Sequence, residues 1–134
     1  MTGATYDALS ASDCAIVASG TATIEAALLG TPLVVIYRVA PLTAMVLRHL
    51  LRTPFIGMVN LIAGRMVAPE LIQDKFTAES VAAQVQRLLD SPRAREEMKS
   101  GLAEVRAKLG PGGAIERAAD VFARMLEAGA AAGN

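Results

Sequence analysis

The sequence predicts an α/β fold, namely part of a doubly wound, Rossmann-like domain that ends in several helices. Two short apolar runs rich in β-branched residues flank a segment of strong helix formers, and the second half of the chain carries apolar residues at helical spacing. Two strands joined through a helix are parallel, and their connection is right-handed. With 134 residues, the chain is long enough for one compact domain.

The first predicted unit consists of helix, strand, helix and strand. In order, these elements are expected at residues 5–12, 14–18, 22–29 and 33–37. Both predicted strands are continuous apolar runs, which is typical of strands buried on both faces. Gly30 is a fitting end for the second helix, and Thr31 with Pro32 turns the chain into the second strand.

The middle of the chain predicts less regular structure. Pro41 opens a mostly apolar segment over residues 42–51, and residues 54–68 are expected to form a loop with at most one short strand. Residues 69–72 are expected to start a helical turn. Because two strands do not make a stable sheet alone, we expect the first strands of the domain to lie upstream of Met1.

Helical periodicity dominates from Thr77 onward. Thr77 is an expected N-cap, and Ser91 followed by Pro92 is a second helix start. The glycines at residues 110–113 end that helix, and a last helix follows. The apolar positions expected to face the interior are Val81, Val85, Leu88 and Leu89, then Met98, Leu102, Val105 and Leu109, then Ala118, Val121, Phe122, Met125 and Leu126.

The composition excludes several classes of function. Apolar residues make up 53% of the chain, so it is not a disordered protein. Lys plus Arg number 13, and Asp plus Glu also number 13, so the net charge is zero. Aromatic residues make up only 4% of the chain. Both observations argue against a nucleic-acid partner. Cys14 and His49 are the only Cys and His residues, which excludes Cys/His metal sites. No run of about 18 apolar residues exists, so we expect a cytoplasmic protein, either soluble or peripherally attached to a membrane.

The turn Ser19-Gly20-Thr21 is the strongest candidate for a ligand site. It follows a predicted parallel strand and opens a helix, and ligands of open α/β sheets bind at the carboxyl ends of the strands. Free N–H groups at the helix start, a glycine that permits close approach and two hydroxyl groups suit a phosphate. The alternative is that Ser19 only caps the helix and Gly20 only makes the turn.

Four further polar residues are candidates for substrate binding. Glu25 lies one helical turn after Thr21, where a carboxylate can accept hydrogen bonds from ribose hydroxyls, or can simply be a solvated helix residue. Arg38 follows the second strand and suits a phosphate, or a surface ion pair. Asn60 and Arg65 bracket a Gly-containing segment, where they either bind substrate or hold the loop through its backbone.

Two other residue types are interpreted as structural. His49 has no partner motif, which favours a surface or interface histidine. Cys14 at the start of a predicted strand is interpreted as a small buried hydrophobe and not as a nucleophile.

Three strings of the sequence resemble the lipid-A-disaccharide synthase family. They are ASGTATIEAAL at 18–28, GTPLVVIYR at 30–38, and NLIAGR at 60–65, the last followed by Val67 and by PEL at 69–71. They occur in the family's order and spacing, and the resemblance covers most of the chain. The sequence departs from the family's pattern at Val59, where the family usually has a proline that would restrain the backbone.

The resemblance implies a glycosyltransferase of lipid A and lipopolysaccharide biosynthesis with the two-domain fold called GT-B. It joins UDP-2,3-diacylglucosamine to 2,3-diacylglucosamine 1-phosphate, giving lipid A disaccharide 1-phosphate and UDP, without a metal or other cofactor. It implies that Ser19, Gly20 and Thr21 approach the UDP phosphates and that Glu25 binds the ribose. Arg38, Asn60 and Arg65 match the family's strings and are expected to bind substrate.

The same resemblance implies that this chain is the C-terminal portion of such an enzyme. Residues 1–75 would be the second half of the donor-binding α/β domain, and residues 76–134 the C-terminal helices of that domain. The acceptor pocket and the catalytic carboxylate would lie in a missing N-terminal half, so no catalytic residue is assigned here and the chain alone is expected to be inactive. The alternatives are an enzyme like UDP-N-acetylglucosamine 2-epimerase, or a non-catalytic nucleotide-binding half-domain.

Because the expected substrates are acylated, residues 42–52 are predicted to lie near a membrane surface. Their apolar side chains would meet the acyl boundary, while Arg48 and Arg52 would face lipid phosphates. The alternative is a helix packed against the missing domain.

Overall fold

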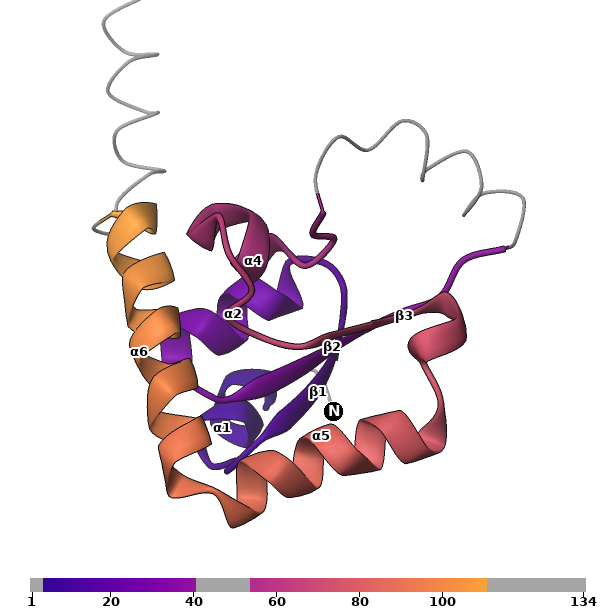
Figure 1. Ribbon diagram of the computed structural model, residues 1–134. Helices are drawn as coiled ribbons and strands as arrows, with labels where there is room; N and C mark the ends of the chain where they lie inside the picture. Colours follow the sequence, from indigo (N-terminus) through magenta and orange to yellow (C-terminus); the bar gives the residue numbers. More distant parts are fainter. Residues whose placement is uncertain (1–3, 41–53, 111–134) are drawn as a thin grey trace, which may run out of the picture.

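A computed structural model describes residues 4–40 and 54–110 of the chain (Figure 1). The helices and strands are α1 (Thr5–Ser10), β1 (Ala15–Ala18), α2 (Ala22–Leu29), β2 (Leu33–Tyr37), α4 (Met58–Ala63), β3 (Glu70–Ile72), the 3₁₀ helix η1 (Gln73–Lys75), α5 (Ala78–Asp90) and α6 (Pro92–Leu109). The predictions for residues 42–52, including His49, and for the helix after residue 113 lie outside the described residues.

The three strands form a parallel sheet in the order β1-β2-β3. This confirms the α/β class and the parallel strand–helix–strand unit, with β2 and α2 at the predicted positions. Val35 in β2 lies between Val17 of β1 and Glu70 of β3 in the register. These three residues therefore point to the same side of the sheet.

The prediction of a helical turn at residues 69–72 was wrong, because Glu70–Ile72 is the strand β3. Its backbone pairs with β2, and the Val35 N–H donates to the carbonyl of Pro69 at 2.9 Å. A strand of three residues carries almost no periodicity of its own, so its conformation follows from the pairing with β2.

The prediction of a loop over residues 54–68 was also wrong, because this segment contains the helix α4. The helix is only six residues long and lies between Gly57 and Gly64, the latter in a left-handed conformation with φ of 76°. Such a short helix is not stable on its own. It packs against α2 and α6, and these tertiary contacts stabilise it.

The helices cover the two sides of the sheet unequally. In Figure 1, α2 and α4 lie together on one side, α5 runs along the other, and α6 stands at the end of both layers, where it contacts α2, α4 and α5. The buried core is built from all three strands, chiefly the first three residues of β2, from one face each of α2, α4, α5 and α6, and from Ala68, which precedes β3. Its members are Val17, Ala26, Ala27, Leu33, Val34, Val35, Val59, Ala68, Leu71, Leu88, Met98, Leu102 and Val105.

The predicted helix starts are confirmed, and the predicted apolar faces only in part. The hydroxyl of Thr77 accepts from the Ser80 N–H, and that of Ser91 accepts from the Ala94 N–H, each at 3.2 Å. Leu89 and Leu109 were expected to be buried but are 48% and 41% exposed. Both lie in the last turn of their helix.

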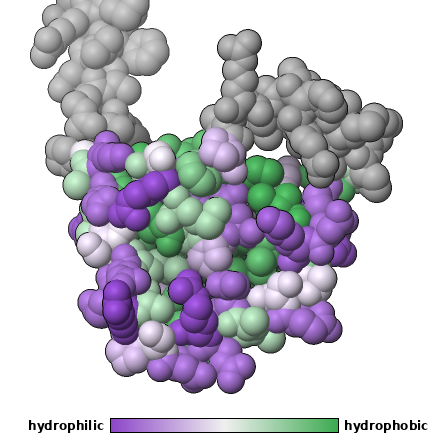
Figure 2. Space-filling model, in the orientation of Figure 1, coloured by the Kyte–Doolittle hydropathy of each residue, from purple (hydrophilic) through white to green (hydrophobic). Residues whose placement is uncertain are grey.

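The prediction that the first strand is buried on both faces was wrong for the described part of the chain. Val17 is buried beneath α2, but Ile16 on the opposite face is 52% exposed. The reason is the position of β1 at the edge of the sheet, whereas α5 packs against β2. On the face drawn in Figure 2, apolar surface is set among polar side chains. Among the described residues, no helix is both long and apolar enough to cross a membrane.

Candidate nucleotide-sugar site

The turn between β1 and α2 is tied to the sheet and remains open on its outer side. The Ser19 N–H donates to the carbonyl of Ile36 at 2.9 Å, and the hydroxyl of Thr23 donates to the carbonyl of Gly20 at 2.7 Å. Gly20 has a φ of 152°, and a Cβ added there would meet no atom within 4 Å. Gly20 therefore has a backbone conformation that favours glycine, and the space next to its Cα is free.

Three successive backbone N–H groups of this turn, at Gly20, Thr21 and Ala22, have no hydrogen-bond partner among the described residues. They begin helix α2, whose N-terminal end carries partial positive charge. Thr21 is exposed and its hydroxyl is also free within the same part of the structure. Together these groups can accept an anion such as a phosphate.

The hydroxyl of Ser19 is used within the protein. It donates to the carbonyl of Ile56 at 3.1 Å and so joins the β1–α2 turn to the segment that precedes α4. In this arrangement the free hydroxyl donor of the turn is that of Thr21, and Ser19 holds the turn in place.

Glu25 lies on α2, one helical turn beyond Thr21, and is half-buried. Its backbone N–H donates to the carbonyl of Thr21 at 3.2 Å, while its carboxylate has no partner among the described residues. A half-buried carboxylate without a partner, one turn from the open N–H groups, is available to accept hydrogen bonds from a ligand.

Arg38 follows β2 at the carboxyl edge of the sheet, but its guanidinium lies over Phe76. Nη2 donates to the carbonyl of Phe76 at 2.7 Å, and the guanidinium carbon lies 5.0 Å from the centre of the ring. Val39 next to it exchanges two hydrogen bonds of 3.1 Å with the side-chain amide of Gln73, which has a positive φ of 51°. The side chains of Arg38 and Gln73 thus connect the segment that follows β2 with the segment that follows β3.

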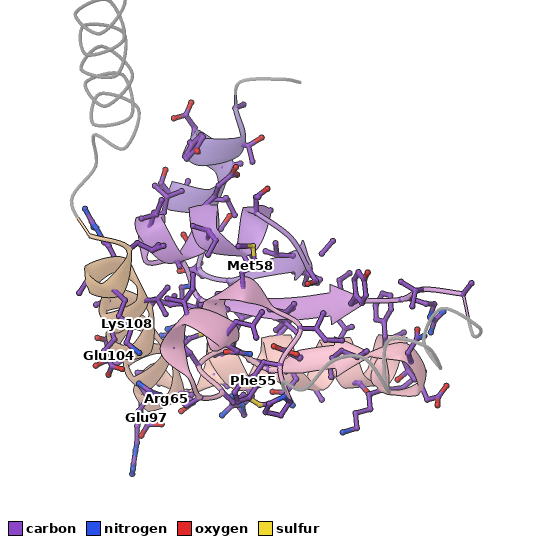
Figure 3. All side chains as sticks on the ribbon, turned by 90° about the horizontal axis from the view of Figure 1, so that it is seen from above. Phe55, Met58, Arg65, Glu97, Glu104 and Lys108 are labelled. Carbon is purple, nitrogen blue, oxygen red and sulfur yellow. The ribbon has the colours of Figure 1, made fainter. Side chains whose placement is uncertain are left out.

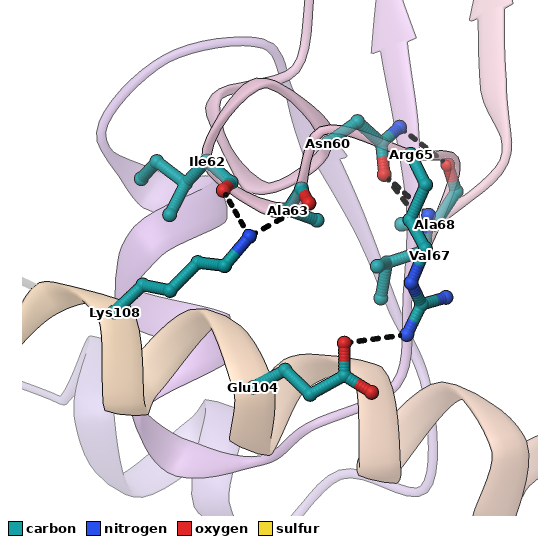
Figure 4. A network of polar contacts seen from close by, with 8 residues as sticks. All are labelled: Asn60, Ile62, Ala63, Arg65, Val67, Ala68, Glu104 and Lys108. Atoms are coloured by element: carbon teal, nitrogen blue, oxygen red, sulfur yellow. Dashed lines mark hydrogen bonds and ion pairs between the residues drawn. The ribbon is translucent and has the colours of Figure 1, made fainter.

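Asn60 is fully buried, and both ends of its amide are used within the protein (Figure 4). Oδ1 accepts from the N–H groups of Val67 and Ala68 at 2.7 and 2.9 Å, and Nδ2 donates to the Ala68 carbonyl at 2.8 Å and to Glu70 at 2.7 Å. This geometry matches the alternative in which Asn60 holds the loop through its backbone. A direct contact of Asn60 with substrate stays a prediction.

Arg65 lies on the surface between α4 and α6. It forms an ion pair of 2.8 Å with Glu104, and each side chain is 51% exposed. Nearby, the Lys108 ammonium donates to the carbonyls of Ile62 and Ala63 at the end of α4. Figure 3 shows Arg65, Glu104 and Lys108 in a row along α6. Arg65 is thus not brought together with the β1–α2 turn by any contact of the described residues, and its predicted contact with substrate stays a prediction.

A family model described as lipid-A-disaccharide synthetase matches residues 1–121, which is most of the chain. The chain belongs to this family. It is 55% identical over 118 residues to the lipid-A-disaccharide synthase of Acidobacterium capsulatum, covering 87% of this chain and 30% of that protein. It is 51% identical over 126 residues to that of Solibacter usitatus, covering 93% and 33%, and 49% identical over 121 residues to that of Geobacter metallireducens, covering 90% and 32%. The chain spans about a third of the length of these relatives.

In this member of the lipid-A-disaccharide synthetase family, one residue of the site region was missed by the sequence analysis. Glu70, at the start of β3, accepts three hydrogen bonds through its carboxylate. The sequence offers one indication of this residue: Glu70 is a carboxylate directly before the apolar pair Leu71 and Ile72. Its partners lie 10 to 14 residues away in the sequence, so no local pattern shows them.

Proposed function

We propose that this chain carries part of the nucleotide-sugar site of a lipid-A-disaccharide synthase with the GT-B fold. The complete enzyme joins UDP-2,3-diacylglucosamine to 2,3-diacylglucosamine 1-phosphate and releases UDP. The observation that carries the proposal is the open β1–α2 turn, with three unpartnered N–H groups at the carboxyl edge of a parallel sheet. This is the place where α/β domains bind ligands, and it lies in a chain whose family acts on lipid A precursors.

The proposed chemistry of the turn is electrostatic. The N–H groups of Gly20, Thr21 and Ala22 and the Thr21 hydroxyl would bind the diphosphate and stabilise the negative charge that develops on UDP as it leaves. The free carboxylate of Glu25 would accept hydrogen bonds from the ribose hydroxyls. Arg38 would contribute if it exchanges its bond to Phe76 for the phosphate, a change that keeps the guanidinium at the same edge.

We further propose that residues 1–75 and 76–134 are the second half and the C-terminal helices of one donor-binding domain. The position of β1 at the edge of the described sheet supports this, since further strands would pair with its free backbone edge. The acceptor pocket and the catalytic base would then lie in the part of the relatives that this chain does not span. Positioning of two substrates contributes on the order of 7–11 kcal/mol to such reactions, so the chain alone should not catalyse transfer.

A pair of measurements tests the proposed function. UDP is titrated into the isotope-labelled chain and followed by NMR, and the complete protein is assayed for transfer with both acylated sugars. The proposal expects UDP-dependent shifts at Gly20, Thr21 and Ala22, together with acceptor-dependent UDP release by the complete protein only. Epimerisation of UDP-N-acetylglucosamine without transfer would favour the epimerase alternative. UDP binding without any turnover of the complete protein would favour a non-catalytic nucleotide-binding module.

A further inference from the structure

We propose that Glu70 is a positioning residue of the nucleotide-sugar site, which holds the Ile56–Gly57 turn against the Ser19–Gly20 turn. This inference rests on the proposed function. Glu70 itself forms no hydrogen bond with the open N–H groups. It acts on them through the Ile56–Gly57 peptide unit and the Ser19 hydroxyl.

The Glu70 carboxylate accepts hydrogen bonds from three donors. Its Oε2 accepts from the Ile56 N–H at 2.9 Å, and its Oε1 accepts from the Gly57 N–H at 2.9 Å and from Nδ2 of Asn60 at 2.7 Å. Two of these donors directly precede α4, and the third, Asn60, lies within this helix. One carboxylate therefore fixes the start of this helix on the sheet.

The segment before α4 is in turn connected to the β1–α2 turn. The Ile56 residue donates its N–H to Glu70 and accepts the Ser19 hydroxyl at its carbonyl, 3.1 Å away. Ser19 also donates its own N–H to Ile36 at 2.9 Å and directly precedes Gly20, the first of the open N–H groups. A shift of Ile56 would thus be transmitted to the residue that orients these groups.

A carboxylate fits these donors better than an amide does. A glutamine has one oxygen and one NH₂ group in place of the two oxygens. Its NH₂ group would therefore face an N–H donor of the protein, and no hydrogen bond could form there. The carboxylate also lies at the N-terminal end of α4, where negative charge is favourable. None of the ion pairs of the described residues includes Glu70, so its charge is balanced by these N–H groups.

The packing around Gly57 shows how little room the segment has to move. A Cβ at Gly57 would lie 3.0 Å from Oε1 of Glu70 and 3.4 Å from the Val35 methyl groups. The turn is therefore pressed between β2 and the Glu70 carboxylate. Loss of the carboxylate bonds would leave the part-buried N–H groups of Ile56 and Gly57 without these partners, and the turn would move to find others.

The test uses the complete protein with the variants E70Q, S19A and E70Q/S19A, and E97Q as a matched control. Glu97 is on the exposed side of α6, where its only described partner is Arg93. The readouts are the Kd for UDP, the KM for each of the two substrates, kcat and the melting temperature.

We expect E70Q to weaken UDP binding and raise the donor KM by about tenfold or more, with the acceptor KM within about twofold of wild type. We expect S19A to weaken UDP binding by a smaller factor at a nearly unchanged melting temperature, and the double variant to be no worse than E70Q by more than about twofold, because both act through Ile56. E97Q should equal wild type.

Three outcomes would overturn the proposal: wild-type UDP affinity in E70Q with only a lower melting temperature, equal losses for donor and acceptor, or effects of E70Q and S19A that multiply. If E70Q does not fold, S19A alone decides, since it removes the same link from the other end with little loss of buried structure. A wild-type complete protein that binds no UDP would instead refute the proposed function itself.

Discussion

The side-chain amide of Asn60 donates a hydrogen bond to the carboxylate of Glu70 across 2.7 Å, and the two side chains together hold α4 on the sheet. Asn60 binds the backbone that follows the helix, and Glu70 binds the backbone that precedes it. Both ends of a six-residue helix are thus held by side chains that contact each other.

From this pair we predict that Asn60→Asp destabilises the protein more than Asn60→Ala. The alanine loses four hydrogen bonds of a fully buried group, at a cost on the order of 2–4 kcal/mol. The aspartate keeps the bonds to Val67 and Ala68 N–H but places a carboxylate against Glu70 and against the Ala68 carbonyl. Melting temperatures of the complete protein, with Gln86→Ala on exposed α5 as control, check the order; a more stable aspartate variant contradicts it.

Gly101 in α6 is predicted to resist replacement by alanine. Inside a helix alanine is favoured over glycine by about 1 kcal/mol, but a Cβ here would lie 2.7 and 3.1 Å from the two methyl carbons of Val67. Val67 is attached to the loop that Asn60 holds, so it yields only at a cost of about 1–3 kcal/mol. We expect Gly101→Ala to lower the melting temperature, whereas Ser100→Ala, next to it on the exposed side, should leave it equal or higher.

The open turn predicts a severe effect of Gly20→Val on donor binding. The backbone at Gly20 has a φ of 152°, which side chains rarely adopt, and a branched side chain would occupy the space in front of the free N–H groups. The donor KM of the complete enzyme should rise steeply, with some loss of stability from the strained backbone. A variant with wild-type donor KM would show that no ligand approaches this turn.

Glu25→Gln is predicted to weaken the use of the donor without unfolding the protein. The carboxylate has no partner among the described residues, so its removal should leave the melting temperature nearly unchanged. Charge-assisted hydrogen bonds contribute about 1.5–3 kcal/mol, which corresponds to a loss of roughly tenfold to a hundredfold in kcat/KM for the UDP-sugar. Kinetics equal to wild type would support the alternative that Glu25 is only a helix residue, and would leave the fold assignment intact.

Cys14 is predicted to be a slow nucleophile in the folded protein. Burial raises the pKa of its thiol, an effect only partly opposed by a hydrogen bond with the backbone of Ala15. Because the thiolate is the reactive form, alkylation at pH 8 should be slower in the folded chain than in urea, and its rate should keep rising at a pH where a free thiol has levelled off. By the same linkage, ionisation of Cys14 disfavours the folded state as the pH rises above the pKa of the unfolded thiol. Equal rates in folded and unfolded protein would contradict the burial of this thiol.

Several elements could be predicted from the sequence because their signals are local. Residues 33–37 are apolar and rich in β-branched side chains, residues 22–29 favour a helix that Gly30 ends, and Thr77 and Ser91 cap their helices. In each case the residues that decide the conformation lie within one helical turn or one strand of each other. The open turn at Gly20 belongs to the same group, since it lies between a predicted strand and a predicted helix.

The sequence by itself therefore determined the α/β class, the parallel unit around the Ser19–Gly20 turn and the family. Only the tertiary structure decided that residues 58–63 are a helix, that residues 70–72 are a strand, and that Ile16 is exposed. It also decided that the polar side-chain atoms of Ser19, Asn60 and Glu70 form hydrogen bonds with nearby backbone groups. The physical reason is that short elements gain their stability from contacts distant in the sequence, such as the pairing of Val35 with Glu70, and no local pattern of residues encodes these contacts.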